Sequence, residues 1–300
     1  MKTLSNKYSY YLQCFIIAVC FIAMGNVSLA QDNTEVTPVV KNELVKKTFI
    51  GNLLIDNQTC MVPVKGVFEF VIQHRFGVIN NGYKDFYGLY APSNIRLGFN
   101  YTPIEDLQVG FGFTKERLMW DGNLKYAIIK QSKVGGTPVS VTYYGNFGVD
   151  TRPKEGNFVN NADRLSYFHQ LIFARKVNKK LSLQVSPSIS WFNNVDGYIS
   201  SDGSIKAKSE NLHFGTAFMG CYAVNDNFSV IANYDQPFTQ HPTNNPNPNI
   251  SFGFQVGTAT HTFQMFLGNY QSIVPQLNNL YNKNDYSNSQ YVIGFNITKR

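Results

Sequence analysis

The feature that most constrains this chain is a strict alternation of apolar and polar residues over long stretches. The pattern is clearest in residues 95–102, 107–114 and 250–257, where every second side chain is apolar. Successive side chains of an extended strand leave opposite faces, so the alternation predicts strands with one apolar and one polar face. Most alternating stretches run for about nine to fourteen residues, longer than a typical soluble strand and close to what a tilted strand needs to cross a bilayer.

The alternation predicts about twelve strands, joined by links that are short and long in turn. The strands are expected at 66–76, 94–102, 107–117, 123–132, 138–150, 164–177, 181–193, 211–224, 228–238, 250–257, 261–270 and 290–299. One link, near residues 119–122, is short where a long one is expected. Outer-membrane barrels have tight periplasmic turns and longer outer loops. We therefore expect an all-β fold, a single antiparallel transmembrane β-barrel with short periplasmic turns and long outer loops.

Composition excludes several other classes of protein. Charged residues make up 15% of the chain and aromatic residues another 15%, which is unlike a disordered chain. Four cysteines in 300 residues are too few for a disulfide scaffold. Beyond the N-terminus, no apolar run approaches the ~20 residues of a spanning helix. The net charge of +7 is spread along the chain without a basic patch or a reading motif, so no nucleic-acid partner is expected.

The first thirty residues have the features of a secretory signal. Lys2 and Lys7 form a basic start, residues 15–24 are apolar, and residues 28–30 (SLA) end in small side chains. This order predicts a signal peptide over residues 1–30 that is cleaved before Gln31. A membrane anchor is the alternative, but the apolar run is too short for it. Secretion and a barrel together predict the bacterial outer membrane as the location.

Residues 31–65 precede the barrel proper, which we assign to residues 66–300. An even number of strands places both ends of the barrel on the same, periplasmic side. Residues 31–60 have few aromatics, mixed charge and no clear period, although 45–55 are apolar enough to pack. We expect a partly ordered periplasmic cover, and a disordered lead-in or a strap that enters the lumen are the alternatives.

The polar faces of the expected strands supply the candidate site. On the first strand, Phe68, Phe70 and Ile72 share the face that we expect to meet lipid, so the other face points into the barrel. The predicted lumen-lining residues are Glu69, Gln73, Arg75, Arg96, Asn100, Asn233 and Asp235. Their charges could hold a polar solute or set an ion preference. The alternative is an internal salt-bridge network that fills the barrel, because buried charges must be paired whatever the function.

No pattern in the chain predicts catalysis or metal binding. The five histidines, His74, His169, His213, His241 and His261, are too far apart for a local metal motif. None is followed two residues later by serine, and neither a nucleophile elbow nor a phosphate loop occurs. We therefore predict no enzyme, no metal and no cofactor. By parity, His213 and His261 are expected to point inward.

Two cysteines remain after removal of the signal peptide, Cys60 and Cys221. Both are expected near the periplasmic end, Cys60 just before the first strand and Cys221 close to a short turn. The sequence allows a disulfide that ties the N-terminal segment to the barrel wall, in a compartment that permits one. The alternative is two free, buried thiols.

Several stretches carry a resemblance to a known family. They are 68–77 (FEFVIQHRFG), 84–100 (KDFYGLYAPSNIRLGFN) and 109–114 (VGFGFT), and the most specific parts are 73–77 and 94–98. Together they resemble a Bacteroidota family of outer-membrane β-barrels of unknown function. The similarity covers most of the chain, from about residue 66 to residue 299. It implies a location and a fold, and no activity.

The leading functional hypothesis is a narrow channel or transporter for small polar solutes, lined by Arg75, Arg96, Glu69 and Asp235. The second is a closed structural or interaction barrel that presents its outer loops to a partner. The third is a membrane-embedded enzyme that acts on lipid. A plugging N-terminus and fully paired inward charges would favour the second hypothesis. The expected partners are outer-membrane lipid and, for a channel, a small polar solute; the sequence does not identify a protein partner.

Overall fold

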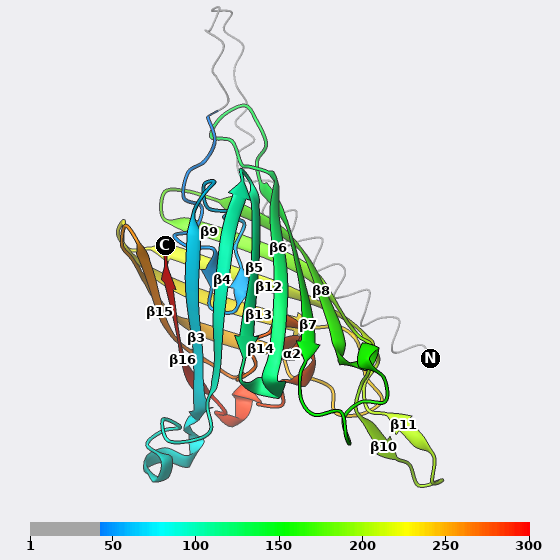
Figure 1. Ribbon diagram of the computed structural model, residues 1–300. Coiled ribbons are helices and arrows are strands. Elements are labelled where there is room, and N and C mark those ends of the chain that lie inside the picture. The colour runs from blue at the N-terminus through cyan, green and yellow to red at the C-terminus, as the bar shows by residue number, and fades with distance from the viewer. Residues whose placement is uncertain (1–42) are drawn as a thin grey trace, which may run out of the picture.

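The computed structural model describes residues 43–300, in which twelve strands close into one barrel (Figure 1). Every strand pairs antiparallel with its neighbours in the chain, and β16 pairs with β3 to complete the ring. The strands are β3 (Phe68–Val78), β4 (Asn94–Ile104), β5 (Leu107–Thr114), β6 (Met119–Ile129), β7 (Ser140–Asp150), β8 (Leu165–Lys176), β9 (Leu181–Phe192), β12 (Leu212–Ala223), β13 (Phe228–Pro237), β14 (Asn249–Gly257), β15 (His261–Gly268) and β16 (Val292–Lys299). The predicted fold class is confirmed. The predicted signal peptide lies outside the described residues.

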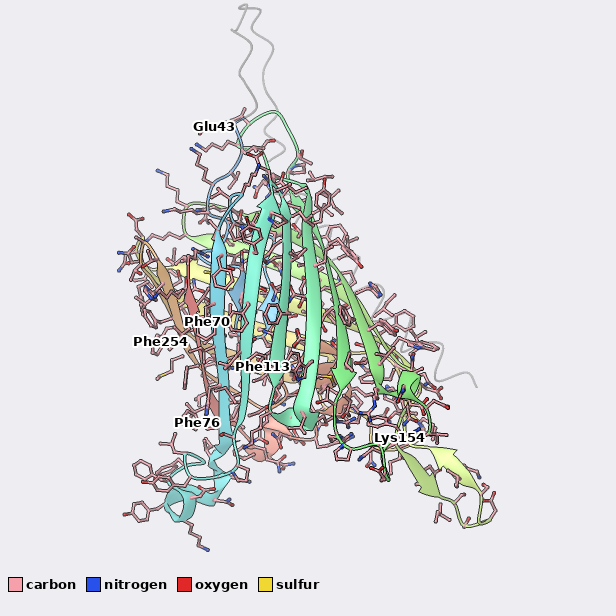
Figure 2. The ribbon with its side chains drawn as sticks, viewed as in Figure 1. Glu43, Phe70, Phe76, Phe113, Lys154 and Phe254 are labelled. Carbon is pink, nitrogen blue, oxygen red and sulfur yellow. The ribbon has the colours of Figure 1, made fainter. Side chains whose placement is uncertain are left out.

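The two ends of the barrel differ as the link lengths predict. The C-terminus and Glu43 lie at the end that carries the short turns, which we call the short-turn end (Figures 1 and 2). Lys154 lies at the opposite, long-loop end (Figure 2). That end carries η1 (Ile79–Asp85), η2 (Glu116–Leu118), η3 (Asn161–Arg164), the hairpin of β10 (Gly197–Ile199) and β11 (Ile205–Ala207), α2 (Pro275–Tyr281) and η4 (Tyr286–Asn288). The link at η2 is the one short connection among the long ones, as expected.

The alternation places apolar side chains on the outer wall and polar side chains inside. On β3, Phe68 is exposed on the outer wall, whereas Glu69 and Gln73 are buried inside. Both tryptophans of the chain, Trp120 and Trp191, are exposed and stand one residue from the long-loop end of their strands. Aromatic residues at this position form the girdle that marks the bilayer surface on membrane barrels. None of the helices in residues 43–300 has the length and apolar character that crossing a membrane as a helix demands.

Two segments enter the barrel and fill it. The first is a hairpin of β1 (Leu53–Leu54) and β2 (Asn57–Gln58), which precedes the first barrel strand. The second is the short helix α2, which contacts β8, β9, β12 and β13. We call residues 48–61 the plug. Residues 48–61 are therefore a strap inside the lumen, one of the alternatives for the N-terminal segment, and the expectation of a periplasmic cover is wrong for them.

Candidate functional site

The seven predicted lumen-lining residues all lie on the inward-facing positions of their strands. Five of them, Glu69, Gln73, Arg75, Asn233 and Asp235, are buried. Arg96 and Asn100 are partly buried, and Asn100 stands apart from the polar clusters described below, beside Gly110 of β5. The other residues contact the plug or one another, so they do not form an open ring of charge.

Glu69 is satisfied by three different parts of the chain. Its carboxylate accepts hydrogen bonds from the side-chain amides of Asn52 in the plug and, at 3.0 Å, of Gln108 on β5. It also forms a salt bridge with Arg300, with 2.7 Å between Nε and Oε1. The N-terminal plug and the C-terminal residue thus meet at one buried carboxylate.

Lys125 on β6 is fully buried, and its ammonium group also contacts the plug. Its Nζ donates to the backbone oxygen of Asn52 at 3.1 Å and to Oε1 of Gln58 at 3.0 Å. The sequence interpretation did not include Lys125 among the lumen residues, although it lies inside the expected strand. Lys125 follows Asn123 by two residues and therefore lies on the same, polar face of the strand. That pattern could have identified it as a lumen residue.

Arg96 has a well-defined partner, Asp121 at the start of β6. Their two hydrogen bonds measure 2.8 and 2.7 Å and form a bidentate pair. Gln73 accepts from Arg96 at 3.1 Å, and Asn146 donates to Asp121 at 3.0 Å. This pair is an internal ion pair of the kind that a filled lumen requires. The sequence interpretation missed Asp121 because it placed the start of this strand at residue 123.

Arg75 is fully buried, and no carboxylate of the described residues lies within salt-bridge distance of it. Its guanidinium instead donates to the backbone oxygen of Ile55 in the plug at 3.3 Å and to Oδ1 of Asn296 at 2.9 Å. It also lies over the ring of Phe266, 4.5 Å from the centroid. The guanidinium group of Arg75 therefore holds the tip of the plug hairpin against the wall.

A second acidic cluster joins the plug to the helix. Asp56 of the plug accepts hydrogen bonds from the hydroxyl of Tyr270 at 2.7 Å and from the side-chain amide of Asn278 on α2. The amide of Asn233 donates to both Asp56 and Asp235, at 3.3 Å in each case. The two segments that fill the lumen are thus connected to each other as well as to the wall.

The plug also packs through apolar side chains. Its members Phe49, Leu54, Ile55 and Cys60 belong to a buried cluster with side chains from the wall, namely Tyr144, Phe168, Ile172, Ala174, Met219, Cys221, Ile231, Phe266 and Tyr270. Two cavities inside the lumen, next to the plug and α2, measure about 10 and 20 Å³. Each has room for about one water molecule. A wider hollow of about 520 Å³ at the short-turn end reaches the plug at Thr48 and Phe49.

The two cysteines do not form the disulfide that the sequence allowed, and both are free, buried thiols. They share the apolar cluster but face different parts of it. The backbone of Cys60 is bonded to Thr142 on β7 and Gln184 on β9, whereas Cys221 lies on β12 and faces Ser229. The alternative of two free thiols is the one that the structure contains.

The histidines also differ in part from expectation. His213 faces inward and pairs with His241 of the β13–β14 loop, with 3.0 Å between Nδ1 and Nε2. His261 instead shares the outward parity of Phe263, so its expected inward orientation is wrong. Among residues 43–300, no group of three or more His, Cys, Asp or Glu side chains is arranged to hold a metal ion.

Residues 49–300 match a family described as "Membrane bound beta barrel domain (DUF5777)". The chain belongs to this family. The match agrees with the membrane-barrel part of the resemblance noted in the sequence, while the phylum stays a prediction. No match was found among curated proteins.

Solved structures with a similar fold include outer-membrane porins and channels. The NanC porin superposes with a TM-score of 0.48 at 11% identity, covering 77% of this chain and 98% of that chain. An outer membrane channel from Pseudomonas putida F1 gives 0.47 at 13%, covering 80% and 96%. The KdgM porin gives 0.44 at 8%, covering 77% and 98%. Similarity at this level carries no information on what this barrel binds or transports.

Proposed function

We propose that this protein is a closed outer-membrane barrel that acts through its surfaces and not as an open pore, with its short turns in the periplasm. One observation carries the proposal: the plug and α2 fill the middle of the lumen, where two cavities beside them hold about one water molecule each, and the wider hollow at the short-turn end stops at the plug. Of the functions considered from sequence, the interaction barrel fits this geometry better than the narrow channel.

The energy of plug release supports the same choice. Phe49, Leu54 and Ile55 are almost completely buried. Exposing them would cost roughly 5–9 kcal/mol in total, at ~1.5–3 kcal/mol for each side chain. An open state would then be populated on the order of 10⁻⁴ to 10⁻⁷ of the time. The charges that a channel would use for selectivity, such as Arg96, are occupied by contacts within the protein.

The β3–β4 loop is the best candidate for the surface that meets a partner. It projects from the long-loop end (Figure 1), and Tyr83, Phe86, Tyr87 and Tyr90 are exposed on it. Large aromatic side chains are enriched at protein interfaces and among their energetic hot spots. Asp85 braces the loop, because its carboxylate accepts hydrogen bonds from a neighbouring amide side chain and a backbone N–H, which also lower the pKa of the carboxyl. The partner that we propose for the exposed aromatic side chains of this loop is another protein.

The same loop is seated on the end of β3 by a close glycine contact. The backbone N–H of Gly77 donates to the oxygen of Gly88 at 3.0 Å. A Cβ at Gly77 would lie 2.3 Å from the Cβ of Ala91, so only glycine fits. Phe86 and Tyr87 have φ values of 52° and 56°, a left-handed conformation that bulky residues rarely adopt. Strain of this kind persists only where the surrounding structure fixes the backbone, and it is concentrated at functional sites.

Conductance of the refolded mature chain in a planar bilayer tests the proposal. We expect no steps from the intact chain, and steps from a variant in which Leu54→Asp and Ile55→Asp together dislodge the plug. Val64→Asp is the matched control, since Val64 is in the same segment but exposed. Steady, ion-selective steps from the intact, folded chain would overturn the closed barrel and support the narrow channel.

A further inference from the structure

The outer wall of the barrel carries a groove at the long-loop half of β8, β9 and β12. It has a volume of about 920 Å³, within the range of small-molecule sites. Most of its wall side chains stand on the outward-facing positions of these strands and of β7, and residues of the neighbouring loops complete its edge. They include Tyr143, His169, Leu171, Ile189, Leu212 and Phe214. Because these positions face away from the lumen, the groove opens toward the membrane.

The groove exists because two neighbouring outward positions lack bulk. Pro187 on β9 lies opposite Thr216 on β12, and both contribute to the groove. Proline has no N–H to donate to the sheet and therefore disturbs a central strand. The pairing of β8 with β9 is interrupted here, since it stops at Gln170 and resumes at Phe173. A small side chain and a broken ladder thus hollow a wall that is otherwise covered by large apolar residues.

Trp191 fixes the depth of the groove in the bilayer. It lies on the outward parity of β9, next to the long-loop end, where aromatic residues mark the membrane surface. Ile189 and Pro187 follow at two and four residues toward the membrane centre. At ~3.3 Å per residue, the groove reaches about 13 Å along the strand below Trp191. Glu210, from the loop before β12, forms the rim on the water side.

A polar pair stands inside this apolar groove. The hydroxyl of Tyr143 and Nδ1 of His169 are 2.6 Å apart, so they share a hydrogen bond. The neutral pair carries two protons, one on the phenol and one on the imidazole. Whichever group donates within the pair, one proton is left for an outside acceptor. At this depth, just below the aromatic girdle, the acceptor that a bilayer supplies is the ester carbonyl of a lipid.

We propose that the groove binds one acyl chain of a membrane lipid, whose ester carbonyl accepts a hydrogen bond from the Tyr143–His169 pair. The occupant follows from the surroundings: below its rim the groove faces hydrocarbon, and the Tyr143–His169 pair offers a donor at the level where the chain joins its headgroup. The site lies on the outer wall and does not depend on whether the lumen is closed.

The two tryptophans provide a matched pair of reporters for the test. Both are exposed on the outer wall next to the long-loop end, but Trp191 is beside the groove and Trp120 is on β6. The probe is a phosphatidylethanolamine with bromines midway along its acyl chains, added in small amounts to the folded full-length mature protein in detergent micelles. In Trp120→Phe, we expect quenching of Trp191 that saturates near one lipid per protein. In Trp191→Phe, quenching of Trp120 should rise only in proportion to the lipid content of the micelle.

Two variants in the Trp120→Phe background complete the experiment. Thr216→Phe fills the groove and should abolish the saturable quenching, whereas Met265→Phe adds a ring to the lipid-facing wall of β15 and should not. Removing both donors with Tyr143→Phe and His169→Phe should weaken binding about fivefold. Equal quenching of the two tryptophans would overturn the proposal. So would saturable binding that survives Thr216→Phe in a barrel shown to be folded by circular dichroism, or equal binding of a brominated alkane that has no ester.

Discussion

The tip of the plug hairpin offers a sharp test of how the lumen is closed. Ile55 is completely buried there, yet its φ is 59°, in the left-handed region. For an L-residue this conformation costs roughly 1–2 kcal/mol, and only glycine adopts it readily. Ile55→Ala and Ile55→Gly both lose the buried side chain, at about 2–5 kcal/mol. Glycine also relieves the strain, so we expect Ile55→Gly to be more stable than Ile55→Ala by about 1 kcal/mol.

Leu54 is the matched control for this comparison. It is equally buried, belongs to β1, and has no left-handed φ. Within a strand, glycine is less stable than alanine by roughly 0.5–1 kcal/mol because it loses more backbone freedom on folding. The order of the two variants should therefore reverse between Leu54 and Ile55.

Hydrogen exchange of the plug amides, followed by mass spectrometry on the folded barrel in micelles, measures the free energy of plug opening directly. Urea unfolding monitored by tryptophan fluorescence would show whether the plug opens separately from the barrel. If Ile55→Gly exchanged faster than Ile55→Ala, by the margin seen at Leu54, the strain argument would be refuted. The closed lumen would then rest on side-chain burial alone.

Three further predictions follow from the polar contacts and the loops. Arg96→Ala or Asp121→Ala alone should destabilise the barrel by about 3–5 kcal/mol in urea unfolding, because each leaves one buried charge without its partner. The double variant should be destabilised by less than the sum of the two single variants. Burial lowers the pKa of His241, so the folded loop keeps it neutral, and the stability this gives is lost as the pH falls below ~6.5. Once the intrinsic exchange rate, which itself falls with pH, is divided out, amide protection in that loop should fall between pH 7.5 and 5, and His241→Gln should reduce this pH dependence. Gly77→Ala should displace the aromatic loop at a cost of about 1–3 kcal/mol and expose it to limited proteolysis, whereas Gly220→Ala, with ordinary space for a Cβ, should not.

The barrel strands could be predicted from sequence because the two faces of every strand have different surroundings. Lipid on one side and a polar interior on the other impose the alternation that Phe68 and Glu69 begin. The start of β6 was misplaced because η2 shortens the preceding connection. That error hid Asp121, the partner of Arg96, although Arg96 itself was correctly placed on the inward face.

The contents of the lumen could not be predicted in the same way. The plug has no alternation, and its position depends on contacts between residues far apart in the chain, such as Asp56 with Asn278. The helix α2 lies within a stretch that was expected to be an outer loop. Pro275 at its start was a usable signal, because proline is favoured in the first turn of a helix. No local pattern indicates that this helix turns into the barrel.

The plug and the lipid-facing groove are connected through the weakest part of the wall. Between the two halves of the interrupted β8–β9 pairing, the sheet lacks the hydrogen bonds that Pro187 cannot supply. The plug bridges the same two strands from inside: Gln170 of β8 donates to Asn57 at 3.2 Å, and Gln184 of β9 donates to the backbone oxygen of Gln58 at 2.7 Å. A wall hollowed for a lipid chain therefore depends on the plug for its closure. Dislodging the plug should raise hydrogen exchange in β8 and β9 more than in β4 and β5, whose ladder is continuous at mid-wall. Uniform exchange around the barrel would show that the plug fills the lumen without supporting the wall.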